Sequence, residues 1–215
     1  MATSERAFVL RHTRLQRLPG FGDLRLHLSD DVLEVWRAVQ DMTGDRDSPI
    51  PFWAFAWGGG LAIASFVRDQ PEVVSGRRVL DIASGSGVCG IAASRAGASV
   101  VTAVDIDPFA DAAIRLNARA NGQRVNVMRA DLLDNEPPDV DLILAGDCWY
   151  EEGFGARVTA WLQRARERGI DVLIGDPGRR YLARDTLSEL ASYDVRSTTD
   201  LEDLGRNRAT VYAVN

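Results

Sequence analysis

The stretch of sequence that decides the fold spans residues 79 to 90 and reads Val79-Leu80-Asp81-Ile82-Ala83-Ser84-Gly85-Ser86-Gly87-Val88-Cys89-Gly90. An apolar run typical of a β-strand ends in an acid and then breaks into a loop of small residues. Glycines in such a loop let the backbone pass close to a ligand, because no Cβ intervenes. The stretch therefore predicts a nucleotide-binding turn between a strand and a helix.

The glycine spacing also fits the dinucleotide fingerprint G-x-G-x-x-G, with Asp105 lying 20 residues after Gly85. The strand, however, ends in the acid Asp81. A carboxylate there would repel a pyrophosphate and attract an ammonium or sulfonium group. S-adenosylmethionine carries both cations and no phosphate, so we favour it as the cofactor and regard a dinucleotide oxidoreductase as the weakest alternative.

Three further acids, Asp105, Asp131 and Asp147, each follow an apolar run further along the chain. Parallel strands present their carboxyl ends at one edge of a sheet, where ligands bind in open α/β folds. Asp105 is suited to accept both ribose hydroxyls, and Asp131 to accept the adenine amino group. Each acid alone is more often a helix cap or a turn residue. The ordered set predicts a cofactor site.

The remaining pattern predicts an α/β fold. Helices alternate with strands, which indicates a mostly parallel, Rossmann-like sheet with helices on both faces. The last two apolar runs, 193–199 and 209–214, have no helix between them and should pair antiparallel. The helices are expected at residues 61–68, 88–96, 108–121, 153–168 and 184–192.

We divide the chain into an N-terminal helical appendage and loop, residues 1–50, and the domain that contains the predicted sheet and cofactor site, residues 51–215. Within the appendage, an apolar stripe predicts a helix from Asp30 to Met42, capped by Ser29 or Asp30. The polar, turn-rich residues 43–50 that follow are a candidate lid.

Residues from about 50 to 215 resemble a class I, seven-strand S-adenosylmethionine-dependent methyltransferase. Three segments are more specific and resemble the electron transfer flavoprotein β-subunit lysine methyltransferase family: PFWAFAWGGG at 51–60, GDCWY at 146–150 and IGDPGR at 174–179. The resemblance implies a seven-stranded sheet and methyl transfer to a lysine, with the electron transfer flavoprotein β subunit as substrate and partner. One departure is Ala83, where the family usually has the first loop glycine; it narrows the room beside the methionine moiety.

Combining residues and resemblance, we assign the site as follows. Asp147 should orient the amine, and Tyr150 should supply a second hydrogen bond or a channel wall. Asp176 and Arg179 either shape the protein-substrate surface or only hold a turn, and Trp53 and Trp149 either line a lysine channel or pack in the core. Cofactor binding is assigned to Trp57, Asp81, Ala83, Ser84, Gly85, Gly87, Asp105, Ile106, Asp131 and Asp147.

Composition limits the other possibilities. Net charge is −6, which argues against broad nucleic-acid binding, and all 25 basic residues are arginine, as in proteins from high-GC bacterial genomes. The chain contains only two cysteines and two histidines, His12 and His27, so we expect no disulfide framework and no metal site. We expect a cytoplasmic monomer that binds no membrane.

Two alternatives stay open at this stage. The first keeps the cofactor but changes the substrate to a ribosomal-protein lysine or to a small, nicotinamide-like amine. The second is a binding module without catalytic activity that uses the fold only for protein contacts, against which the intact acids Asp105, Asp131 and Asp147 argue.

Overall fold

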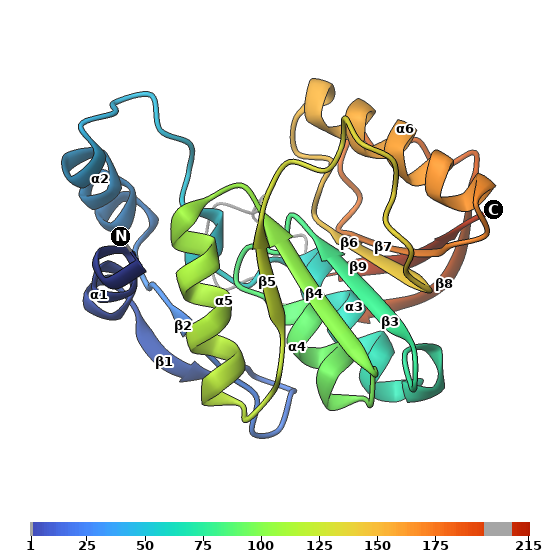
Figure 1. The fold of residues 1–215 in the computed structure, drawn as a ribbon, viewed down its shortest axis with the longest axis horizontal. Helices are drawn as coiled ribbons and strands as arrows, with labels where there is room; N and C mark the ends of the chain where they lie inside the picture. The colour runs from blue at the N-terminus through green and yellow to red at the C-terminus, as the bar shows by residue number, and fades with distance from the viewer. Residues whose placement is uncertain (1, 196–207) are drawn as a thin grey trace.

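One mixed sheet of seven strands forms the centre of the molecule, in the order β5-β4-β3-β6-β7-β9-β8 (Figure 1). The computed structural model describes residues 2–195 and 208–215. β3 to β7 run parallel, and β9 runs antiparallel to both β7 and β8. This confirms the predicted α/β, Rossmann-like sheet with an antiparallel C-terminal hairpin. The strands are β3 (Arg78–Ile82), β4 (Val100–Asp105), β5 (Asn126–Arg129), β6 (Leu142–Gly146), β7 (Asp171–Asp176), β8 (Leu187–Asp194) and β9 (Arg208–Val214).

Helices cover both faces of the sheet. Neighbouring residues of a strand point to opposite faces, so Val79 packs in the cluster with α3 and α4, whereas Leu80 packs with Trp161 of α6. Among the described residues, no helix is long and apolar enough to cross a membrane. The helices that flank the sheet are α3 (Gly58–Asp69), α4 (Val88–Arg95), α5 (Pro108–Ala120) and α6 (Glu152–Glu167).

The predicted helix at 184–192 is wrong, because these residues lead into and form much of strand β8. Its Leu, Glu and Ala residues favour a helix locally, but pairing with β9 overrides that weak preference. β8 and β9 pair antiparallel from Leu187↔Val214 to Asp194↔Arg208, with a register shift between Glu189 and Ala191. Of the strand predicted at 193–199, residues 196–199 lie outside the described residues.

The N-terminal appendage lies outside the seven-stranded sheet, as predicted, but it also contains a two-stranded sheet that was not predicted from the sequence. The predicted helix at 30–42 is present as α2, with Asp31 rather than Ser29 or Asp30 as its cap. The appendage packs on α5, with the rings of Phe8 and Phe109 4.8 Å apart. Its elements, with two short 3-10 helices that follow, are α1 (Ala2–His12), β1 (Arg14–Arg17), β2 (Arg25–Leu28), α2 (Val32–Thr43), η1 (Phe52–Ala54) and η2 (Pro71–Val73).

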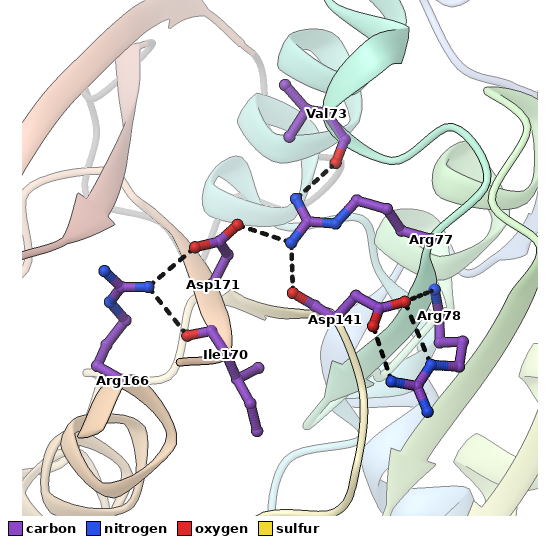
Figure 2. Close-up of polar contacts among 7 residues, drawn as sticks. All are labelled: Val73, Arg77, Arg78, Asp141, Arg166, Ile170 and Asp171. Carbon is purple, nitrogen blue, oxygen red and sulfur yellow. Dashed lines mark hydrogen bonds and ion pairs between the residues drawn. The ribbon is translucent and has the colours of Figure 1, made fainter. Parts of the chain in front are cut away.

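An arginine–aspartate network joins the amino ends of β3, β6 and β7 (Figure 2). Arg77 donates to Val73 O at 3.1 Å, to Asp171 Oδ2 at 2.7 Å and to the carbonyl of Asp141. Asp141 in turn accepts from Arg78 at 2.8 Å. Three strands that are far apart in sequence are thereby tied together at one edge of the sheet.

The opposite edge of the sheet is aligned by strand register. Ile82 lies opposite both Val104 and Ala145, and Gly146 lies opposite Gly175. The loops after β3, β4, β6 and β7 therefore start at the same level, which brings the acids at these strand ends into one region.

Candidate active site

A cavity of about 520 Å³ opens at the carboxyl edge of the sheet. The loop after β3 lines it, and acidic and aromatic side chains from four other stretches of the chain, within residues 52–57, 105–107, 131 and 147–154, contribute to its wall. Of the residues predicted for the site, the wall contains Trp53, Trp57, Asp81, Ala83, Ser84, Gly85, Asp105, Ile106, Asp131, Asp147, Tyr150 and Arg179.

The loop after β3 is a tight turn built on left-handed backbone. Ala83, Gly85 and Gly87 have φ angles of +46°, +53° and +82°. The turn brings the backbone N of Gly85 within 2.8 Å of Asp105 Oδ2. Gly87 lies behind the wall as the cap of α4, where an added Cβ would come within 3.2 Å of Ile114. Ala83 thus holds a conformation that glycine adopts more easily.

Asp81 fixes this loop from within. It is buried, and its Oδ2 accepts hydrogen bonds from the Ser84 hydroxyl and from Gly90 N, the latter at 2.9 Å. Burial raises the pKa of the Asp81 carboxyl to about 7, against which these hydrogen bonds act. The carboxyl therefore ties the loop to α4, and its predicted contact with a ligand ammonium stays a prediction.

Asp105 is held by backbone donors on both oxygens. Gly85 N donates to Oδ2, and Asp107 N donates to Oδ1 at 3.0 Å. Burial raises the pKa of this carboxyl, which lies between the glycine loop and the start of α5. Ile106 beside it is exposed. Such a fixed carboxylate suits the bidentate ribose contact that the sequence predicts.

Asp131 lies at the far side of the cavity, after β5. Its carboxylate accepts from Leu133 N at 3.0 Å and from Arg157 Nη2 at 2.9 Å. The Leu133 hydrogen bond, followed by Arg157, lowers the pKa of Asp131. Arg157 of α6 was not predicted, because only the fold brings α6 over the loop after β5.

Asp147 lies at the N-terminus of α3. Its Oδ2 accepts from Gly60 N at 2.7 Å, and its own backbone N donates to Gly175 O at 2.9 Å. Its φ of +60° is unusual for a non-glycine residue, and such strain concentrates at functional sites. The positive end of the α3 dipole favours the charged carboxylate.

Arg179 pairs with Asp147, with 3.2 Å between Nη2 and Oδ1, and both side chains are largely buried. Asp176 is fully buried and lies outside the wall, where its Oδ1 accepts from Gly178 N at 2.7 Å and from Arg179 N at 2.6 Å. Of the two predicted interpretations, Asp176 therefore fits the turn-holding one, whereas Arg179 reaches the cavity.

The two predicted channel tryptophans lie differently. Trp149 is fully buried behind the wall, and its Nε1 donates to Thr159 Oγ1 at 3.0 Å, so its position fits core packing. Trp53 is also buried and stacks on Phe109 at 5.8 Å, but it still contributes to the wall.

Aromatic rings close one side of the cavity. Trp57 donates from Nε1 to Phe52 O at 2.9 Å, and the Phe52 ring lies 4.8 Å from that of Tyr150. Phe154 extends the row at 5.4 Å from Tyr150. Burial raises the pKa of Tyr150 to about 12, so its hydroxyl stays protonated at neutral pH. Phe154 was not predicted from the sequence, because Tyr150 lies before the first residue of α6 and helical spacing does not connect the two rings.

Known proteins resemble this chain over most of its length. The electron transfer flavoprotein beta subunit lysine methyltransferase of Xenopus laevis is 36% identical over 218 residues, covering 99% of this chain and 87% of the relative. Its counterpart from Mus musculus is 39% identical over 196 residues, covering 88% and 76%. Residues 66–146 match the family model of ribosomal protein L11 methyltransferase (PrmA).

Among solved structures, a putative RNA methyltransferase from Pyrococcus horikoshii superimposes with a TM-score of 0.56 and 17% sequence identity. The match covers 85% of this chain and 93% of that one. At this identity the likeness concerns the fold alone, and it agrees with the sheet described above.

Proposed function

This chain belongs to the electron transfer flavoprotein beta subunit lysine methyltransferase family, and from that premise we propose that it methylates a lysine of the electron transfer flavoprotein β subunit, with S-adenosylmethionine as methyl donor. One observation supports this proposal for the present chain. A single cavity contains Asp105, held by the glycine loop, together with Asp147 and Tyr150. Cofactor and amine could therefore meet within it.

The residues of the cavity fit S-adenosylmethionine. Its wall contains six carboxylate side chains against two arginines, which suits a cationic ligand better than a pyrophosphate. Asp105 would hold the ribose, Asp131 the adenine, and the loop from Ala83 to Gly85 the methionine moiety. When bound, the cofactor supplies a methyl group made electrophilic by its sulfonium.

The remaining wall residues would act on the substrate. Asp147 orients the amine through its carboxylate, and Tyr150, protonated at neutral pH, donates a hydrogen bond or lines the entry. The row Trp57, Phe52, Tyr150 and Phe154 excludes water and offers an apolar surface on which the aliphatic stem of a lysine side chain can pack. Alignment and water exclusion are the main requirements of an in-line displacement.

We further propose a monomeric enzyme that acts on a protein and not on nucleic acid, supported by the net charge of −6. The arginine-only basic composition supports a bacterial source, and for such a protein we propose a cytoplasmic location. The relatives named above are animal proteins, so neither source nor compartment follows from them.

The test is to incubate the protein with radiolabelled S-adenosylmethionine and an extract of its host, with and without purified electron transfer flavoprotein, and to locate the label by digestion. Methyl-lysine in the β subunit, abolished in the Asp147→Ala variant, is expected. Label on a ribosomal protein or on a small amine would keep the reaction and replace the substrate. Cofactor binding without transfer to any lysine in a host extract would contradict the proposal.

A further inference from the structure

The ion pair between Asp147 and Arg179 raises a question of charge. Lysine has a pKa of about 10.4 in water and must lose a proton before its nitrogen can attack a methyl group. An unpaired carboxylate beside the amine would stabilise the ammonium and so oppose this loss. The residue proposed to orient the amine would then also inhibit it.

The structure compensates this charge on both carboxylate oxygens. Gly60 N, at the positive end of α3, donates to Oδ2 at 2.7 Å, and the Arg179 guanidinium lies 3.2 Å from Oδ1. Only 15% of the Arg179 side chain and 10% of that of Asp147 are exposed, so water screens this pair weakly. A buried cation is thus built into the place where the amine must be neutral.

We propose that Arg179 neutralises Asp147 so that the cavity takes the substrate lysine as a neutral amine, which makes Arg179 a positioning residue that sets the protonation state of the substrate. This inference rests on the proposed function and concerns the same cavity. Asp147 then keeps its lone pairs for orienting the amine without holding the proton on it.

The turn after β7 holds Arg179 for this role. Asp176 accepts from the backbone N of both Gly178 and Arg179, and Gly178 takes a φ of +91° that favours glycine. Register pairs Gly146 with Gly175, so Asp147 and Asp176 lie side by side at the ends of β6 and β7. One acid fixes the backbone of Arg179, and the other receives its side chain.

Several other ionisable groups of the cavity wall already have partners within the protein. Arg157, the second arginine, pairs with Asp131 and Asp134 at 2.9 and 3.0 Å. Asp105 accepts from Gly85 N in the loop after β3, and Asp81 accepts from Gly90 N in α4. The other ionisable residues that line the cavity with Asp147 and Arg179 are Asp81, Cys89, Asp105, Asp107, Asp131, Cys148, Tyr150, Glu151 and Arg157. Asp176 lies behind the wall, and the Arg184 guanidinium lies next to Gly178 in the turn that holds Arg179.

The proton balance follows directly. The substrate ammonium gives its proton to water on entering the cavity, which leaves a lone pair on nitrogen. That lone pair forms the new N–C bond while the C–S bond of the donor breaks and its electron pair stays on sulfur. Arg179 and Asp147 keep their charges throughout, so no residue of the pair has to be reset between turnovers.

The experiment uses whichever lysine substrate the labelling assay identifies, so a wrong partner and a wrong role for Arg179 give different results. Substrate binding to the enzyme saturated with S-adenosylhomocysteine is followed by calorimetry at pH 8 in buffers of different ionisation enthalpy. Wild type should release about one proton per lysine bound, and Arg179→Met clearly less. In the pH dependence of kcat, the acidic limb reports the pKa of the bound lysine. Arg179→Met should raise that pKa and so move the limb to higher pH by about one unit or more.

Three companion variants separate charge from structure. Arg179→Lys keeps the positive charge, so the acidic limb of its kcat profile should lie at the wild-type pH. Arg179→Gln should behave as Arg179→Met does, and it replaces Arg179→Met if the methionine variant fails to fold. Arg179→Met combined with Asp147→Asn removes both charges and should return the proton release on substrate binding towards wild type, a readout that needs no turnover. A lowered kcat in Arg179→Met with an unchanged limb and unchanged proton release would overturn the proposal and leave Arg179 a structural residue.

Discussion

Replacing Gly59 by alanine tests how closely α3 must approach β7. A Cβ at this position would lie 2.1 Å from Gly175 O and 2.8 Å from Asp147 Oδ2, whereas ordinary van der Waals contact begins near 3.4 Å. The first of these neighbours is backbone and cannot rotate away. α3 must therefore move from β7 by about 1 Å, at an overpacking cost of about 1–3 kcal/mol or more.

Local propensity argues in the opposite direction. Alanine in a helix is favoured over glycine by about 1 kcal/mol, so propensity alone predicts that Gly59→Ala stabilises the protein. Because the contact is as short as 2.1 Å and is made with backbone, we expect the upper end of the overpacking cost, about 3 kcal/mol. This cost outweighs the propensity gain and leaves a net loss of about 2 kcal/mol, or a Tm lower by about 4–8 °C. Because the shift also moves Gly60 N away from Asp147, turnover should fall by about tenfold or more.

Thermal and urea denaturation with parallel turnover assays measure these effects. Gly153→Ala is the matched control, since it also lies in the first turn of a helix but its added Cβ would meet only Glu151 Oε1, at 3.6 Å. The control should be neutral or slightly stabilising. If Gly59→Ala melts at or above the wild-type temperature, the close approach of α3 to Gly175 does not limit the residue at position 59, and the reasoning is wrong.

Three further predictions follow from the site and from the opposite edge of the sheet. Asp105→Ala should weaken cofactor binding by about tenfold to a hundredfold, because it removes a charge-assisted hydrogen bond. Asp147→Ala should bind cofactor almost normally and lose turnover. Calorimetry compares the two variants, and an equal loss of cofactor affinity in both would show that Asp147 is misassigned. Burial raises the pKa of Asp81 to about 7, so the folded state holds a proton that the unfolded state releases above about 4. As the pH rises from 4 to 7, the unfolding free energy of the wild type should therefore fall, by up to a few kcal/mol more than that of Asp81→Asn. Urea denaturation of both proteins at pH 4.5 and 7.5 measures this, and an equal change in unfolding free energy in the two would contradict it. Arg77→Met should lower the unfolding free energy by about 1–3 kcal/mol. It should leave the cofactor Kd unchanged, since Arg77 and its acceptors lie at the end of the sheet opposite to the cavity. A higher Kd for the cofactor would mean that the two ends of the sheet are coupled.

The half of the site that we propose to bind the cofactor was predictable because its signals are local. The glycine loop follows a strand directly, and Asp105 and Asp131 close the next two apolar runs, so strand register alone brings them together. The two-stranded sheet of the appendage also had a local signal, since Leu24, Leu26 and Leu28 alternate and are buried. That signal was missed.

Other contacts of the site and of the sheet were less predictable because they join residues that are distant in sequence. Arg157 meets Asp131 only through the placement of α6, and β8 is a strand only because β9 pairs with it. Trp149 and Arg179 both follow strand ends, yet one side chain turns into the core and the other into the cavity. Neither spacing nor residue type distinguishes these two orientations.

The position of β9 affects the order in which the enzyme can be assembled. β9 comes after β8 in the chain but lies between β7 and β8 in the sheet, so β7 has an open edge until β9 docks. α3 packs on both β7 and β9, and its N-terminus holds Asp147. During synthesis, the wall that receives the substrate is therefore completed only after β9 has left the ribosome, and a nascent chain would not yet be a competent enzyme.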